Sequence, residues 1–212
     1  AGGIIESNLS VTAAGAVTMS DVTTDIDTLG VTTTTGNIAY TDADGFSVGT
    51  VGSVNGISTG AGSVSLTALT GNLLVSNTAA ANDIGATTTI FLTAAADNAA
   101  INLSAGADVE STGGAHSYTA DDIEITGTVT ATGQSVTLAS TTAGDAIDVG
   151  DPGGGGDNVA NTLELAGAEL QNITATGLTI GGTNAGNITV DGISAANSNN
   201  ISGTVTLDAT QD

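Results

Sequence analysis

Apolar and small polar residues alternate along this chain in many short bursts. Val64-Ser65-Leu66, Ile123-Glu124-Ile125 and Val136-Thr137-Leu138 each show a period of two. This period is typical of β-strands, and the β-branched residues Val, Ile and Thr strengthen the indication. Gly, Asn, Asp or Ser interrupts each burst after a few residues. The pattern therefore predicts many short strands.

One segment has a helical spacing instead. Leu163, Ala166, Leu170 and Ile173 would share one face of a helix. Gly167 lies inside this segment, and an interior glycine costs about 1 kcal/mol relative to alanine. We expect at most one short helical turn near residues 163–173.

A glycine motif recurs along the chain in the form Gly–x–apolar–x–apolar. It starts at Gly15, Gly36, Gly62, Gly71, Gly186 and Gly203. Glycine tolerates positive φ and therefore suits tight corners between strands. Such punctuation favours a right-handed parallel β-helix with coils of about 20 residues. We therefore expect an all-β fold, with residues 1–212 forming a single β-solenoid domain of about nine or ten coils.

Two alternatives to the solenoid stay open. An antiparallel sandwich normally has strands of five to six residues and a buried Trp or Tyr, whereas the aromatic residues here are only Tyr40, Phe46, Phe91 and Tyr118. Disorder is suggested by high net charge with few large apolar residues. The regular apolar spacing, a single proline and a charged fraction of 10% favour a folded chain.

The charge balance excludes several kinds of partner. The chain has no Lys or Arg and 22 Asp and Glu, which gives a formal net charge of −22. Nucleic acids and anionic membrane surfaces require cationic side chains, so we expect no nucleic-acid partner. No apolar stretch approaches the roughly 20 residues that cross a bilayer, so we expect no membrane insertion. The absence of Cys excludes disulfides and zinc–thiolate sites.

Calcium is the candidate metal, because acidic residues cluster in glycine-rich segments. Asp42-Ala43-Asp44-Gly45 contains the D-x-D-G core of oxygen-rich calcium loops without the bidentate Glu of an EF-hand. Residues 145–157 carry four more Asp, and Asp21, Asp25 and Asp27 form another cluster. Diffuse screening by counter-ions is the alternative. The candidate Ca²⁺ ligands are Asp42, Asp44, Asp145, Asp148, Asp151 and Asp157.

Catalysis has little support in the sequence. His116 is the only histidine, and we interpret it as a plain strand residue because neighbours along a strand face opposite sides. Two carboxylates suffice for glycoside hydrolysis, and Asp42/Asp44, Asp121/Asp122 and Asp145/Asp148 are such pairs. The aromatic, Arg and Lys residues that normally hold a sugar are scarce or missing. We therefore expect no enzymatic activity and no required cofactor.

The last fifty residues resemble a known family. Residues 162–175 (TLELAGAELQNITA) lead into Gly177-Leu178-Thr179-Ile180-Gly181, and residues 184–190 (NAGNITV) and 203–207 (GTVTL) follow. This succession resembles the repeat regions of filamentous-haemagglutinin-like bacterial exoproteins, which form β-helical shafts. The resemblance implies an extracellular or cell-surface location. The complete lack of Lys and Arg departs from the family pattern.

Three functions follow as expectations, in descending order. The first is a non-catalytic structural segment of a secreted bacterial surface filament or adhesin, as an excerpt or processed piece of a larger protein. The second is a subunit that polymerises end to end into an extracellular fibre or sheath, because an uncapped solenoid exposes strand edges at both ends. The third and most remote is a carbohydrate-active β-helix enzyme. The expected partners are other copies of the chain, by end-to-end or lateral assembly, or the surface of a host or neighbouring cell.

Overall fold

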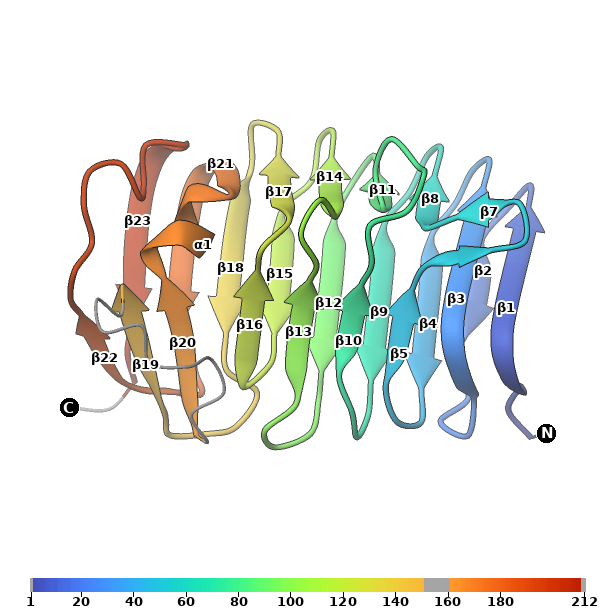
Figure 1. Ribbon diagram of the computed structural model, residues 1–212, viewed down its shortest axis with the longest axis horizontal. Coiled ribbons are helices and arrows are strands. Elements are labelled where there is room, and N and C mark those ends of the chain that lie inside the picture. The colour runs from blue at the N-terminus through green and yellow to red at the C-terminus, as the bar shows by residue number, and fades with distance from the viewer. Residues whose placement is uncertain (1, 151–160, 211–212) are drawn as a thin grey trace.

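The chain coils into a parallel β-solenoid. The computed structural model describes residues 2–150 and 161–210. The strands nearer the viewer run upward and the farther ones downward while the chain advances from right to left, which makes the coil right-handed (Figure 1). Within the described residues every strand pairing is parallel except the short hairpin β6–β7. The predicted all-β solenoid is therefore confirmed.

One face of the solenoid is a stack of eight described strands. Their bounds are β2 (Val17–Met19), β4 (Ile38–Asp42), β9 (Val64–Ala68), β12 (Ile90–Ala94), β15 (His116–Thr119), β18 (Ser135–Ala139), β21 (Ile173–Gly181) and β23 (Ile201–Asp208). Residues 177–181 of β21 belong to this stack, while its first residues pair with β17 on the neighbouring face.

The opposite side of each coil begins as one long strand and divides into two shorter ones. The long strands are β1 (Ile5–Ala13) and β3 (Asp25–Thr33). The first halves are then β5 (Phe46–Val48), β10 (Leu73–Val75), β13 (Ala100–Leu103) and β16 (Asp122–Ile125). The second halves are β8 (Ile57–Thr59), β11 (Ile84–Ala86), β14 (Asp108–Ser111) and β17 (Thr128–Ala131). The hairpin of β6 (Thr50–Val51) and β7 (Val54–Asn55) is inserted between β5 and β8.

Apolar side chains form columns along the inside of the coil. Ile38, Val64 and Ile90 occupy equivalent register positions in successive strands and are completely buried. The residues between them in each strand point outward, so burial alternates as the period of two predicts. The core is thus a narrow column along the solenoid axis, which suits Val, Ile, Leu and Ala.

The coils are longer than expected, so there are fewer of them. Register partners from Ile38 to Val64, from Val64 to Ile90 and from Ile90 to His116 are each 26 residues apart. Only the steps from Val17 to Ile38 and from His116 to Val136 are close to 20 residues. The described strands consequently make eight coils where nine or ten were expected. The added length lies in corners and in the hairpin, where hydrophobic periodicity gives no signal.

The chain departs from simple coiling near its C-terminal end. A three-stranded sheet has the order β20 (Thr162–Ala166), β19 (Asp145–Gly150), β22 (Ala185–Val190). β20 also contacts β16, so it lies between β16 and β19 although it follows both in sequence (Figure 1). The helix α1 (Gly167–Gln171) then leads from β20 into β21. This helix is the single short turn that the sequence predicts near residues 163–173.

Asparagines at the corners connect successive coils. Oδ1 of Asn37 accepts the backbone N–H of Ser63 at 3.0 Å, and Oδ1 of Asn72 accepts that of Ala100 at 2.8 Å. Each amide thus satisfies a backbone donor of the next coil, where the corner interrupts the strand ladder. Side-chain capping of this kind stabilises the stack in addition to the core.

Candidate functional site

Three carboxylates meet at a corner near the N-terminal end. Asp42 ends β4, Asp44 lies in the corner that follows, and Asp25 begins β3. One carboxylate oxygen from each residue lies within 4.8 Å of those of the other two. Coil stacking thus joins the predicted pair Asp42/Asp44 to Asp25, which the sequence places in a separate cluster. Carboxylate oxygens are the ligands that Ca²⁺ prefers.

Asp42 also has a structural role at this corner. Its side chain is completely buried, and Oδ2 accepts the N–H of Ile26 at 3.0 Å and the hydroxyl of Tyr40. Oδ1 accepts the N–H of Asp44 at 3.2 Å. Burial raises the pKa of Asp42 above its ordinary value, and burial together with the Asp42 hydrogen bond raises the pKa of Tyr40. Oxygens already occupied by donors have less capacity for a metal ion, so Asp25 and Asp44 would contribute most to one.

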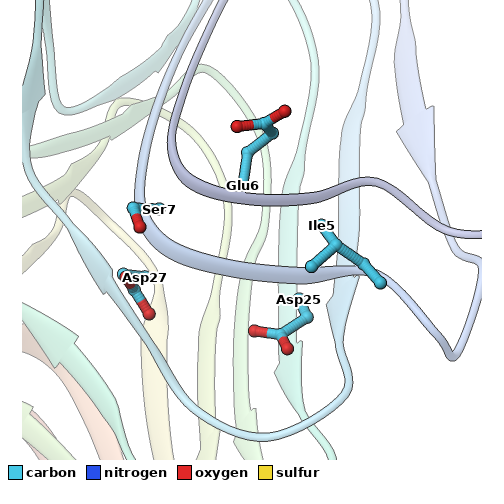
Figure 2. Close-up of a pocket in the computed structure, with 5 residues that line it drawn as sticks. All are labelled: Ile5, Glu6, Ser7, Asp25 and Asp27. Atoms are coloured by element: carbon cyan, nitrogen blue, oxygen red, sulfur yellow. The ribbon is translucent and has the colours of Figure 1, made fainter.

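A shallow acidic depression lies beside this corner. It is lined by Ile5, Glu6, Ser7, Asp25 and Asp27 and has a volume of about 340 Å³. Figure 2 shows the side chains of Asp25 and Asp27 on one side of the strands and that of Glu6 directed away from them. Three carboxylates with no cationic side chain in the sequence make this depression repulsive to anionic ligands.

Of the second predicted calcium segment, the structure describes Asp145 and Asp148, and these two side chains do not face one site. Asp145 and Asp148 are three residues apart in β19, so they face opposite sides of the strand. Asp145 is buried toward the inside, whereas Asp148 lies on the outer side beside Glu164 and Thr189 in register. Asp151 and Asp157 lie outside the described residues.

Asp145 instead forms a buried pair of carboxyl groups with Asp121, which the sequence pattern does not predict. Asp121 and Asp145 are each 3% exposed, and the hydroxyl of Ser140 lies 3.0 Å from Oδ1 of Asp121 and 2.9 Å from Oδ2 of Asp145. Asp121 also accepts hydrogen bonds from the N–H of Asn98 and from the N–H and hydroxyl of Thr142. No local sequence signal joins these residues, because the contact depends on how far one coil is displaced from the next.

The two carboxyl groups of this pair titrate differently. Burial alone would raise the pKa of Asp121, but the hydrogen bonds that its carboxylate accepts, above all from Thr142, outweigh this effect and lower the pKa. Burial raises the pKa of Asp145, and the negative charges of Asp121 and Asp97 add to that increase. Asp121 is therefore the charged member of the pair, and Asp145 is the member that more readily holds a proton.

Most of the candidate catalytic residues are buried, whereas Asp44 is exposed and Asp148 is half-buried. His116 is 1% exposed and faces the inside of the coil, between Ile90 and Val136 in register. Asp42, Asp121, Asp122 and Asp145 are all buried. A glycosidase needs two carboxyl groups flanking a bound sugar, and buried groups that serve backbone donors do not meet that need.

Comparison of the chain with protein-family models, with curated proteins and with solved structures finds no match. In the described part of the chain, α1 is far too short to span a membrane, and no other helix qualifies either. The observations that bear on function are consequently the solenoid and its charge distribution.

Proposed function

We propose that the chain is a non-catalytic structural segment of the shaft of a secreted bacterial surface filament or adhesin. The observation that carries the proposal is the column of inward-facing side chains, whose register row is apolar in every described coil except the one that contributes His116. His116, the one ionisable side chain in its register row, is neutral and hydrogen-bonded. A column of this kind gives a stiff element of constant cross-section, which is what a shaft requires.

The resemblance of residues 162–207 to haemagglutinin-like repeats supports this proposal. Those residues form β20, α1, β21, β22 and β23, so the motif coincides with parallel strands at the end of the solenoid where the coiling is least regular. In this proposal the protein acts outside the cell, on the surface of a host or neighbouring cell or on other shafts, and its contribution is reach. The carboxylates distributed over its corners keep the shaft hydrated.

The proposal is tested by locating the chain in its native source. An antibody against this chain would be used in immunoelectron microscopy of intact cells, and the mass of the labelled protein would be measured after extraction. We expect label on thin surface rods, and a parent protein of several thousand residues. Label inside the cell, or on a compact soluble protein, would contradict the proposal.

A second candidate is a subunit that polymerises end to end, and the register of the inner columns favours it. Val205 and Leu207 occupy the columns that Val17 and Met19 begin, so a second copy stacked on the end would continue both. A native protein of a few hundred residues that forms fibres would favour this candidate over the first.

A further inference from the structure

Seven of the eight strands on one broad face of this acidic chain carry no outward-facing charge, whereas the eighth, β23, carries Asp208. We define the neutral face as the outward-facing residues of β2, β4, β9, β12, β15, β18 and residues 177–181. Every one of them is Thr, Ser, Ala or Gly, apart from Phe91. The opposite side of the coil carries outward carboxylates on several strands, among them Asp27, Glu110, Glu124 and Asp148. The acidic residues in the described part of the chain thus leave these seven strands without outward charge.

Phe91 is the one large apolar side chain on the neutral face, and it is 45% exposed. It lies on β12, the fourth of the seven strands, and therefore at the centre of the face. Its neighbours in register are Ser65 on β9 and Ser117 on β15. Because both neighbours are small, the ring stands above a shallow step on either side.

We propose that the neutral face is a dimer interface between two copies of this chain, related by a two-fold axis that lies in the interface at Phe91, parallel to the strands. Charge argues for a second copy as the occupant. Two chains of formal charge −22 repel one another, and the repulsion is smallest when the neutral faces meet, because no carboxylates are then brought into direct contact. A two-fold axis is the usual symmetry of such contacts, because the same patch then serves both copies.

The shape of the face fits the same arrangement. At the axis the two Phe91 rings pack side by side, and each covers a serine of the other copy. Aromatic anchors at the centre of an interface typically dominate its affinity. With about 4.8 Å between strands and about 3.3 Å per residue, the face measures roughly 30 Å by 16 Å. Two such faces in contact bury on the order of 1,000 Å², the lower range for a specific interface.

A lateral dimer is compatible with the proposed shaft role but does not require it. Lateral pairing would bundle two shafts side by side, whereas end-to-end stacking would lengthen one. A monomeric chain would remove the dimer and leave the shaft proposal standing.

The first test measures mass against concentration by sedimentation equilibrium. The test variant is Phe91→Thr, which continues the threonine pattern of the face. Its control is Val22→Thr, which removes an apolar side chain that is 62% exposed but lies outside the face. We expect the wild type and Val22→Thr to dimerise, and Phe91→Thr to need about tenfold higher concentration. Circular dichroism and thermal melting establish that both variants are folded.

A second test fixes the geometry, because the chain contains no Cys of its own. Ser65→Cys and Ser117→Cys are made as separate proteins and mixed under mild oxidation. The two-fold axis at Phe91 brings position 65 of one copy against position 117 of the other, so the mixed disulfide should form faster than either self-disulfide. A monomeric wild type, a dimer indifferent to Phe91→Thr, or a dimer weakened by Val205→Thr in place of Phe91→Thr would overturn the inference.

Discussion

Nδ1 of His116 lies 3.0 Å from the hydroxyl oxygen of Tyr118, inside the coil. Nε2 of the same ring lies 2.9 Å from Oγ of Ser111, whose own hydroxyl proton is donated to the carbonyl oxygen of Gly114. The Ser111 oxygen can then only accept from Nε2–H, so Nδ1 carries no proton and accepts from Tyr118. The buried ring is thus satisfied in its neutral form, and burial lowers its pKa to about 4.

The His116 ring should make the chain less stable in mild acid. Its pKa is about 6.5 in the unfolded chain and about 4 in the folded one, so between these values only the unfolded chain binds the proton. The contribution of the neutral His116 ring to the free energy of unfolding is complete above pH 6.5 and declines as the pH falls toward 4. For the wild type we expect a loss of about 2 kcal/mol from this group between pH 7 and 4.5.

Urea unfolding at these two pH values, on the wild type and on His116→Gln, measures that contribution. The variant lacks the titrating ring, so its stability should change by about 2 kcal/mol less over the same interval. An identical pH dependence in both proteins would show that the ring does not titrate as its burial requires.

The raised pKa of Asp145 should give a pH dependence of stability opposite in sign to that of His116. The pKa of Asp145 is raised in the folded chain. Its contribution to the free energy of unfolding is therefore full at a pH below its pKa in the unfolded chain, and it is lost as the pH rises through its pKa in the folded chain. Asp145→Asn supplies a permanently neutral group of the same size. We expect this variant to exceed the wild type in unfolding free energy at pH 7.5 and to match it at pH 3.

The control for that comparison is Asp27→Asn, which removes one negative charge from an exposed position. A gain of equal size in Asp27→Asn would attribute the effect to net charge and not to the buried pair. Thermal melting of the three proteins at both pH values separates the two explanations.

Local structure was predictable from this sequence, and the stacking of the coils was not. The alternation in Val64-Ser65-Leu66 and in Val136-Thr137-Leu138 corresponds to β9 and β18, and the helical spacing around Leu170 corresponds to α1. A period of two says which side of a strand is buried, but it does not say which strand lies alongside. The insertion of β20 between β16 and β19 leaves no trace in the pattern.

At the candidate site, too, contacts within one corner were predictable and contacts between coils were not. Asp42 and Asp44 were predictable as a pair from their spacing, whereas the addition of Asp25 depends on how one corner stacks on another. Asp145 was expected at a calcium site with Asp148, and the structure places it against Ser140 and Asp121. Corner lengths vary between coils, and these lengths decide which carboxylates meet.

Close backbone contact at a corner should make Gly114 intolerant of any side chain. A Cβ at this position would lie 2.1 Å from the carbonyl carbon and 2.3 Å from the carbonyl oxygen of Thr88, in the preceding coil. Since backbone atoms cannot yield without moving the coil, we expect Gly114→Ala to cost at least about 2 kcal/mol. Gly15→Ala, where nothing lies within 4 Å, is the matched control and should change stability by less than about 0.5 kcal/mol. Equal costs in urea unfolding would contradict the stacking of these corners.

Calcium should stabilise the chain more than sodium does at matched ionic strength. Asp25, Asp42 and Asp44 bring carboxylate oxygens within 4.8 Å of one another, and a divalent ion relieves their repulsion more effectively than screening alone. We expect millimolar Ca²⁺ to raise the melting temperature, chelation to reverse the increase, and Asp44→Asn to reduce it. Asp27→Asn should leave the calcium effect in place. If Na⁺ and Ca²⁺ act equally on the wild type, the effect is screening and the corner holds no specific ion.

Pulling the chain by its two ends tests the shaft most directly. Each coil contacts mainly its two neighbours, so coils should detach one after another under force. Cysteines added at the two ends of this Cys-free chain provide the attachment points for a single-molecule force measurement. We expect a series of steps, with each 26-residue coil releasing about 90 Å of extended chain. One event that releases the whole chain at once would contradict a shaft built from eight stacked coils.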